Sequence, residues 1–198
     1  MVIILKKLKM EFEKLKIDGL VLCKPKIIED DRGFFAETFR KDLLEDFISQ
    51  KLDFCQHNTS KSSFGVLRGL HFQNKLNAQA KLIRVISGNI IDIIVDIRTN
   101  SSTFKEWASI KINKKNRKQI WIPEGFAHGF ITTSKNAEVN YKANNYWNKE
   151  GERTILWNDK DLNIDWNLNN LKLERPILSD KDLIAKSLAY LENKSELF

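Results

Sequence analysis

The segment KLIRVISGNIIDIIVDIR, residues 81–98, decides the fold of this chain. Its odd positions hold a run of β-branched side chains, Ile83, Val85, Ile91, Ile93, Val95 and Ile97. Its even positions include charged ones, Arg84, Asp92, Asp96 and Arg98. Alternation with a period of two residues is typical of β-strands, and Ser-Gly-Asn at 87–89 is typical of a turn. The segment therefore predicts two strands joined as a hairpin at Ser87–Asn89.

Short β-rich segments surround this pair of strands. We expect further strands at 16–29, 34–39, 54–60, 64–73, 107–113, 118–122, 127–133, 137–147 and 153–157. Helical spacing occurs in two places, at Leu43, Leu44, Phe47 and Ile48 and over residues 180–193. Many short strands separated by turns indicate a sandwich or barrel. The chain is thus predicted to have an all-β core with short helices outside it.

The chain shows no internal repeat, low-complexity tract or Pro/Gly/Ser linker, so its 198 residues predict a single domain over 1–198. Within this domain we expect an N-terminal extension at 1–15, the β core at 16–178 and a C-terminal helical segment at 179–198. Met10 is an alternative start to Met1.

Composition excludes several classes of protein. The formal net charge of +7 could indicate nucleic-acid binding, but the lysines are spread along the chain without a basic helix, zinc spacing or RNP-type motif. A small polyanionic ligand such as a nucleotide explains basic residues equally well. The mean hydropathy of −0.40 and the short apolar run VIIL at 2–5 argue against a membrane protein or signal peptide, so we expect a cytoplasmic protein. Cys23 and Cys55 have neither metal-ligand nor redox spacing.

Two polar residues interrupt the apolar segment VLRGLHFQ, residues 66–73. A strand that only had to pack would avoid Arg68 and His71, because a buried unpaired charge costs several kcal/mol, on the order of a full desolvation penalty. This segment therefore faces something polar. Four other segments place polar groups where packing does not require them: DDRGFFAETF (30–39), PEGFAHGF (123–130), AEVNYKANNYW (137–147) and LSDKD (178–182).

Taken singly, each of these polar groups has a structural explanation. Arg32 and Glu37 could form a surface ion pair, and His128 could be a hydrogen-bonded core histidine. Tyr141 could serve packing, and Ser179 with Asp182 fits a helix capping box. A metal site is a further alternative, but His57, His71 and His128 stand alone without a His-x-His pair, so none is predicted.

Taken together and in order, the segments resemble the dTDP-4-dehydrorhamnose 3,5-epimerase family. The matching pieces are DDRGFFAETF, CQHNTS, GVLRGLHFQ, QAKLIRVISGNIIDIIVDIR, SSTFKEW, IPEGFAHGF, YKANNYW, ILWND and LSDKD, and they cover most of residues 20–182. The resemblance implies a jelly-roll (cupin-like) β-sandwich or barrel that uses no metal and no cofactor. It also implies inversion of C3 and/or C5 of a nucleotide-diphosphate-linked 4-keto-6-deoxy sugar, most simply dTDP-4-dehydro-6-deoxy-glucose giving dTDP-4-dehydrorhamnose.

The family pattern implies four catalytic residues. His71 would be the base, and Asp182 would fix its tautomer and support the imidazolium. Tyr141 would donate a proton on the opposite face of the sugar, and Lys81 would stabilise the enolate oxygen.

The substrate-contacting positions of the family fall on Arg32, Glu37, Gln56, Asn58, Arg68, His128, Trp147, Glu152 and Lys181. Arg68 would face the diphosphate, so we expect a bulge at Gly69 that turns Arg68 and His71 into one pocket. The family often has tyrosine where this chain has Trp147, which leaves the identity of the nucleotide base open.

Three alternatives remain at this point. The same chemistry could act on another nucleotide sugar such as a GDP-linked 4-keto heptose, or at C3 only. The chain could instead be a sugar-binding jelly roll without catalysis. The resemblance further implies a homodimer in which N-terminal residues contribute to the partner's pocket, a product used for cell-surface glycans, and no nucleic-acid or membrane partner.

Overall fold

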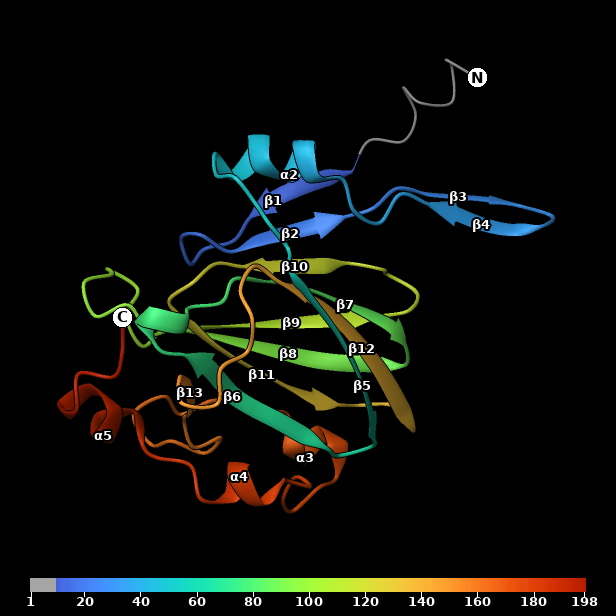
Figure 1. Ribbon diagram of the computed structural model, residues 1–198. Helices are drawn as coiled ribbons and strands as arrows, with labels where there is room; N and C mark the ends of the chain where they lie inside the picture. The colour runs from blue at the N-terminus through green and yellow to red at the C-terminus, as the bar shows by residue number, and fades with distance from the viewer. Residues whose placement is uncertain (1–9) are drawn as a thin grey trace.

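The computed structural model describes residues 10–198, which form two antiparallel sheets packed face to face (Figure 1). The six-stranded sheet has the order β1 (Glu11–Lys14), β2 (Val21–Lys24), β10 (Gln119–Ile122), β7 (Lys81–Ser87), β12 (Asn136–Ala143) and β5 (Gln56–Ser63). The five-stranded sheet has the order β13 (Glu152–Thr154), β6 (Leu67–Gln73), β11 (Phe126–Thr132), β8 (Asn89–Asp96) and β9 (Trp107–Asn113). The predicted all-β sandwich with short outer helices is confirmed.

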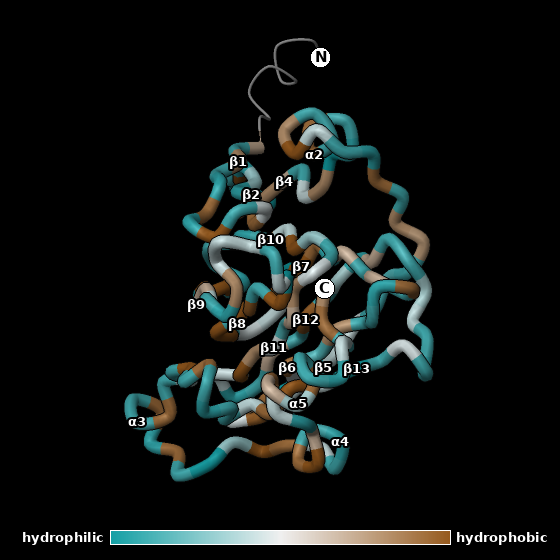
Figure 2. Tube along the Cα trace, turned by 90° about the vertical axis from the view of Figure 1, so that its left-hand side faces the viewer, coloured by the Kyte–Doolittle hydropathy of each residue, from teal (hydrophilic) through white to brown (hydrophobic). Residues whose placement is uncertain are grey.

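A separate hairpin and one helix extend the sandwich at its N-terminal end. Strands β3 (Ile27–Asp30) and β4 (Gly33–Ala36) pair only with each other and project away from both sheets (Figure 1). Helix α2 (Lys41–Ile48) lies where helical spacing was predicted. Figure 2 shows α2 and β1 at one end of the molecule and α3 and α4 at the other.

The hairpin predicted at Ser87–Asn89 is wrong, because β7 and β8 belong to different sheets. Gly88 forms the corner between them with φ +77°, and a Cβ there would lie 2.0 Å from the carbonyl oxygen of Asn136. The side chains that face the core between the sheets are at odd positions before this corner and at even positions after it. Ile83 of β7 packs in the same core as Ile90 of β8, whereas Ile93 faces the opposite core. The alternation predicted two strands correctly, but it contains no information on which sheet each strand joins.

Three apolar clusters hold the layers together. One fills the space between the two sheets, and a second packs the outer face of the five-stranded sheet against the C-terminal segment through Trp166, Leu188 and Leu191. A third lies between α2 and the outer face of the six-stranded sheet, around Trp121. Because β8 contacts a core on each side, nearly all its side chains are buried.

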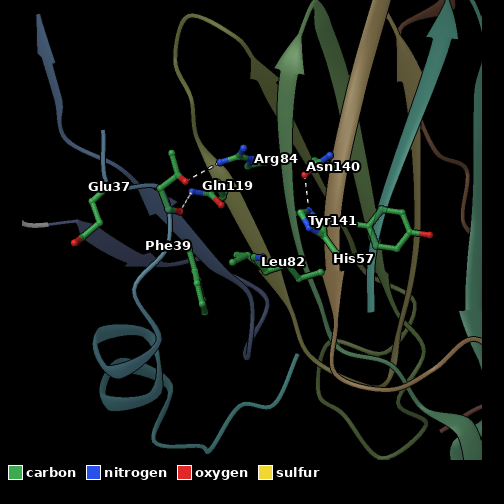
Figure 3. Close-up of a pocket in the computed structure, with 10 residues that line it drawn as sticks. Glu37, Phe39, His57, Leu82, Arg84, Gln119, Asn140 and Tyr141 are labelled. Carbon is green, nitrogen blue, oxygen red and sulfur yellow. Dashed lines mark hydrogen bonds between the residues drawn. The ribbon is translucent and has the colours of Figure 1, made fainter. Parts of the chain in front are cut away.

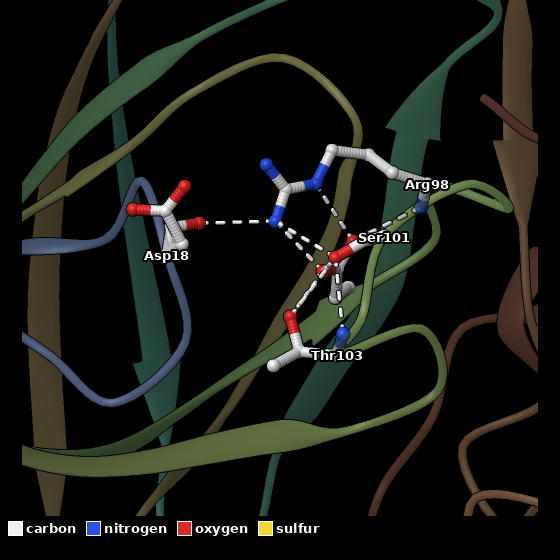
Figure 4. A network of polar contacts seen from close by, with 5 residues as sticks. Asp18, Arg98, Ser101 and Thr103 are labelled. Atoms are coloured by element: carbon white, nitrogen blue, oxygen red, sulfur yellow. Dashed lines mark hydrogen bonds and ion pairs between the residues drawn. The ribbon is translucent and has the colours of Figure 1, made fainter.

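A polar cluster closes the end of β8 (Figure 4). The fully buried Asp96 accepts hydrogen bonds from the backbone N–H and guanidinium of Arg98 and from the hydroxyls of Ser101 and Thr103. Arg98 also donates to the carbonyl oxygen of Asp18. This cluster therefore ties the loop before β2 to the end of the five-stranded sheet.

The C-terminal segment differs from the single helix predicted over 180–193. It contains two short helices, α4 (Asp180–Leu183) and α5 (Leu188–Asn193), and α3 (Leu168–Leu171) precedes them. Lys186 lies between α4 and α5 and bridges Ile155 in parallel, which diverts the backbone from helical geometry.

The predicted N-terminal extension at 1–15 contains a strand that the sequence pattern did not indicate. Strand β1 is the edge strand of the six-stranded sheet and pairs with β2, whereas residues 1–9 lie outside the described part of the chain. Within residues 10–198, no helix has the length and apolarity needed to cross a membrane.

Candidate active site

A cavity of about 260 Å³ lies between the two sheets and collects most of the predicted site residues. It is lined by Arg68, His71, Lys81, His128, Tyr141, Trp147, Glu152 and Lys181, together with Ser60, Phe130 and Val139. His71 comes from β6 of one sheet and Tyr141 from β12 of the other. The cavity therefore presents a base and a potential proton donor from opposite walls.

His71 is held by Asp182 at the start of α4. Nε2 of His71 lies 2.6 Å from Oδ1 of Asp182, whose side chain is almost fully buried. Ser179 caps α4 by accepting a hydrogen bond from the backbone N–H of Asp182, and its hydroxyl donates to Oδ2 of Asp182 at 2.8 Å. The predicted helix cap is confirmed, and it fixes the carboxylate that orients the imidazole.

The protonation of this pair suits proton abstraction. Burial lowers the pKa of His71 and outweighs the opposing effect of Asp182. Burial acts to raise the pKa of Asp182, but the hydrogen bond from His71 and the nearby charges leave that pKa lowered. At neutral pH the pair is therefore a neutral imidazole beside a carboxylate, and the ring nitrogen not bonded to Asp182 is free to accept a proton.

The predicted bulge at Gly69 is confirmed. The pairing of β6 with β11 matches His71 with His128 and Arg68 with Phe130, so β6 has one extra residue between these pairs. Gly69 has φ +137°, and a Cβ there would lie 2.5 Å from the Cα of Gly129. Only glycine fits this close approach. The bulge directs both Arg68 and His71 toward the cavity.

Lys81 and Tyr141 form the wall opposite His71. The ammonium of Lys81 lies 5.9 Å from the centre of the Tyr141 ring. Burial lowers the pKa of Lys81 to about 8, although the charges of Asp92 and Glu152 oppose the change. Burial raises the pKa of Tyr141, against the effect of a hydrogen bond with Asn58. At neutral pH the lysine is a cation and the phenol retains its proton.

Glu152 joins three segments at the mouth of the cavity. Its Oε1 accepts hydrogen bonds from Lys181 Nζ at 2.8 Å and from Trp147 Nε1 at 3.2 Å. The backbone N–H of Trp147 donates to Oε1 of Gln56 at 2.7 Å, and Gln56 in turn donates to Asn58. Gln56 and Asn58 therefore border the site without lining the cavity.

Arg32 and Glu37 lie apart from the other predicted site residues. Arg32 is exposed on the β3–β4 hairpin, where it pairs with Asp30 and not with Glu37. Glu37 lines a second cavity of about 370 Å³ on the outer face of the six-stranded sheet, with His57 and Arg84 (Figure 3). One Glu37 carboxylate oxygen is buried there without a hydrogen-bond partner among the described residues.

The outer cavity does not hold the catalytic constellation, although it is larger. Tyr141 borders both cavities, but Figure 3 shows its ring pointing away from the outer one. His71 and Lys81 do not line the outer cavity. The side chains that do, such as Arg84 and Asn140, alternate along their strands with those that face the inner cavity.

Sequence reasoning missed three residues of the cavity wall, Ser60, Phe130 and Val139, and one residue behind that wall, Asp92 on β8. It is fully buried, and its Oδ1 lies 2.5 Å from Nε2 of His128. A charged residue within the apolar run of residues 89–97 was the available signal. Among the described residues, no group of three or more His, Cys, Asp or Glu side chains could hold a metal ion.

Comparisons with known proteins find similar sequences and similar folds. A family model described as dTDP-4-dehydrorhamnose 3,5-epimerase matches residues 14–190. A dTDP-4-dehydrorhamnose 3,5-epimerase of Shigella flexneri is 46% identical over 170 residues, covering 86% of this chain and 91% of that protein.

Two solved structures are similar in fold. The epimerase of Legionella pneumophila Philadelphia 1, in complex with dTDP-4-keto-L-rhamnose, superposes with a TM-score of 0.88 at 40% identity, covering 94% of this chain and 96% of that one. A 3'-monoepimerase of Streptomyces bikiniensis, in complex with dTDP-quinovose, has a TM-score of 0.87 at 28% identity, with 93% and 91% covered.

Proposed function

The chain belongs to the dTDP-4-dehydrorhamnose 3,5-epimerase family and is an epimerase with a cupin-like jelly-roll fold, and we propose that it converts dTDP-4-dehydro-6-deoxy-glucose to dTDP-4-dehydrorhamnose. The observation that supports this substrate and reaction best is the pair His71–Asp182 facing Tyr141 across one cavity. Inversion of a carbon needs a base on one side and a proton donor on the other. Those two groups come from different sheets.

His71 removes the proton next to the ketone. A C–H bond beside a carbonyl is a weak acid, so the free nitrogen of a neutral, buried imidazole is a suitable base. Asp182 holds the ring in place and stabilises the imidazolium after transfer, as a carboxylate does in other imidazole bases. A positioned base of this kind contributes about 10²–10⁴-fold to the rate.

Lys81 stabilises the enolate that forms. Its ammonium lies in the cavity wall and is charged at neutral pH, so it acts on the oxygen when negative charge develops. One such donor contributes about 3–4 kcal/mol to lowering the barrier.

Tyr141 returns a proton from the opposite face. Its raised pKa keeps the phenol protonated until the enolate carbon accepts the proton. Because removal and return occur on different faces, the configuration of the carbon inverts.

The cations of the cavity hold the nucleotide diphosphate. Arg68 and Lys181 are positioned to pair with phosphate oxygens, and the planar guanidinium suits two oxygens at once. Trp147 is half exposed and offers a flat surface on which a nucleotide base can stack. Gln56 and Asn58 border the same region, and His128 and Glu152 contact the sugar.

The functional unit is a homodimer in the cytoplasm, whose product is used for cell-surface glycans. Arg32 and Glu37 do not reach the cavity of their own chain, and the hairpin that carries Arg32 projects from the sandwich. Phe34 and Phe35 on this hairpin are 53% and 60% exposed, which favours burial against a second copy. In that arrangement the hairpin supplies Arg32 to the partner's substrate, whereas Glu37 follows β4 and lies in the outer cavity of its own chain.

A second candidate function is epimerisation at C3 alone. The Streptomyces bikiniensis monoepimerase is the reason to test this candidate, because its fold superposes almost as well as that of the Legionella enzyme, although its identity to this chain is 28% and not 40%. Both candidates use His71 as the base, and they differ in how the sugar is presented to it.

Deuterium exchange tests these proposals. The protein is incubated in D₂O with dTDP-4-dehydro-6-deoxy-glucose, and NMR follows deuterium entering C3 and C5. Label at both carbons with formation of dTDP-4-dehydrorhamnose is expected, whereas label at C3 alone supports the second candidate. Absence of label at both carbons contradicts both candidates, and a GDP-linked 4-keto heptose is then the next substrate to test.

A further inference from the structure

The inner cavity contains a second imidazole that is held by a carboxylate. His71 and His128 lie opposite each other in the pairing of β6 with β11, and both line the cavity. Nε2 of His71 lies 2.6 Å from Oδ1 of Asp182, and Nε2 of His128 lies 2.5 Å from Oδ1 of Asp92. The first pair is the base of the proposed reaction, whereas the second pair has no step in it. The second pair therefore needs an explanation of its own.

Asp92 is placed to hold the ring of His128. Its neighbours Ile90 and Ile94, two positions away on either side, pack in the core between the sheets, so Asp92 faces the same space. Its relative exposure is 0%, and its side chain makes no other hydrogen bond among residues 10–198. Burying a carboxylate costs free energy unless the group is paired. The bond to His128 is therefore the contact that explains a carboxylate at this position.

This bond fixes which nitrogen of His128 carries the proton. An ionised carboxylate only accepts hydrogen bonds, so Nε2 is the N–H donor. In a neutral imidazole the other nitrogen, Nδ1, then has a lone pair and only accepts. Nδ1 has no hydrogen-bond partner in the described part of the chain, 11% of the side chain is exposed, and the ring lines the cavity. His128 therefore offers a hydrogen-bond acceptor to a ligand.

Few groups of the cavity wall accept a hydrogen bond without also donating one. The cations Arg68, Lys81 and Lys181 only donate, which suits phosphate and enolate oxygens. Glu152 accepts, but its Oε1 is already bonded by two side chains. The free nitrogen of the catalytic base must face a C–H bond. A sugar hydroxyl needs an acceptor for its own proton, and Nδ1 of His128 is the wall atom that remains for it.

The chemistry of the substrate selects the hydroxyl. A nucleotide-linked 4-keto-6-deoxy hexose carries free hydroxyls at C2 and C3, because C1 bears the diphosphate, C4 the ketone and C5 the ring oxygen. Inversion at C3 moves the C3 hydroxyl to the other face of the ring, so a fixed acceptor cannot hold it throughout the reaction. The C2 hydroxyl keeps its configuration whether C3, C5 or both are inverted. A fixed acceptor in the wall is therefore suited to the C2 hydroxyl.

We propose that Asp92 is a positioning residue that fixes the tautomer of His128, and that Nδ1 of His128 accepts a hydrogen bond from the C2 hydroxyl of the sugar. The inference rests on the proposed function and narrows its substrates to nucleotide-linked 4-keto sugars with a free hydroxyl at C2. A pocket built to bond a hydroxyl rejects the analogue that lacks it, because the polar atom of the pocket is then buried without a partner. Sugars that are deoxygenated at C2 are thus the class that the cavity rejects.

The first part of the test reads the tautomer by ¹⁵N NMR in histidine-labelled protein without ligand. The chain contains three histidines, so the ring spectra are simple, and His128→Gln assigns the His128 signals. At neutral pH we expect Nε2 protonated and Nδ1 unprotonated in the wild type and in Asp96→Asn, which removes a buried charge from β8 outside the cavity. Asp92→Asn and Asp92→Leu should raise the share of the tautomer with Nδ1 protonated. A wild type with Nδ1 protonated, or folded Asp92 variants with an unchanged tautomer, overturns the proposal.

The second part measures binding of dTDP-glucose and dTDP-2-deoxyglucose by calorimetry, because both lack the ketone and do not react. We expect the wild type to bind dTDP-glucose at least about 10-fold more tightly than the 2-deoxy sugar. In His128→Gln the amide replaces Nε2 but not Nδ1, so this preference should fall to about twofold or less. In His128→Asn the amide oxygen replaces Nδ1, and more of the preference should remain. If His128→Gln weakens the binding of both sugars equally, the role of His128 is structural and the proposal is overturned.

The binding test does not require an Asp92 variant to fold, and it separates this proposal from the proposed function. Absence of binding of both sugars, together with absence of deuterium exchange, contradicts the proposed function and the hydroxyl contact with it. Equal binding of the two sugars by a wild type that exchanges deuterium overturns the hydroxyl contact alone.

Discussion

Two polar clusters, one at the end of β8 and one around the inner cavity, use buried charge in different ways. The cluster around Asp96 is closed, because Arg98, Ser101 and Thr103 satisfy both carboxylate oxygens (Figure 4). The cluster around the inner cavity is open, because His71, Lys81 and Tyr141 line a cavity of about 260 Å³.

The difference separates stability from catalysis. Saturated hydrogen bonds lower the free energy of the folded state, whereas buried polar groups without partners raise it while remaining available to a substrate. Substitutions in the closed cluster should therefore reduce stability and leave the rate constant unchanged. Substitutions in the open cluster should instead lower the rate constant and change the stability little.

The largest expected effect is on catalysis, from His71→Gln. The glutamine amide can replace Nε2 as the donor to Asp182, but it cannot accept the substrate proton. We expect kcat to fall about 10³–10⁴-fold, near the upper range for general-base removal, with the free energy of unfolding changed by less than about 1 kcal/mol. Initial rates and urea unfolding measure the two quantities.

His57→Gln is the matched control for this change. His57 is an exposed histidine on the outer face of the six-stranded sheet, where it contacts Asn140. Its replacement should leave kcat within about twofold, as is usual for a surface substitution. If the free energy of unfolding of His71→Gln fell by as much as its activation free energy rose, the proposed difference between the two clusters would be contradicted.

The second effect is on stability, from Asp96→Asn. This change breaks a buried charge-assisted network. We expect the free energy of unfolding to fall by about 3 kcal/mol, the low end of the range for a buried ion pair, because Arg98 is partly exposed. In a chain of this size that corresponds to a fall in Tm of about 6–12 °C, measured by calorimetry. The exposed Asp53→Asn is the control and should shift Tm by less than about 2 °C. A normal Tm together with a much lower kcat would assign Asp96 to the catalytic cluster instead.

The smallest effect is the pH dependence of the open cluster. Activity needs His71 neutral, and burial lowers its pKa below 6.5, so kcat/KM should fall only as the pH drops below that value. Activity also needs Lys81 protonated, and its pKa of about 8 sets a decline above that pH. Each limb should approach a tenfold change per pH unit, about 1.4 kcal/mol. An acid limb with a midpoint above pH 7 would contradict the burial of His71, and His57→Gln should leave both limbs in place.

Much of the site follows from ordered local motifs. Arg68 and His71 were singled out because charge within an apolar strand needs a partner, and Gly69 predicted the bulge that brings them together. Arg32 and Glu37 were predicted from the same motifs but lie outside the inner cavity of this chain, since a motif specifies side chains and not where the fold places them. Asp92 was overlooked because it fits the strand alternation, and its bond to His128 spans 36 residues.

The sequence by itself determined the strands, the all-β class and the family, because alternation and ordered motifs are properties of neighbouring residues. It did not determine that β7 and β8 join different sheets, since the alternation is the same on either side of Gly88. Only the tertiary structure decided which charges meet. His71 and Asp182 are separated by 111 residues, and their pairing depends on how the C-terminal segment packs against β6. The pKa shifts that prepare the site for chemistry come from that packing, because burial and neighbouring charge exist only in the folded chain.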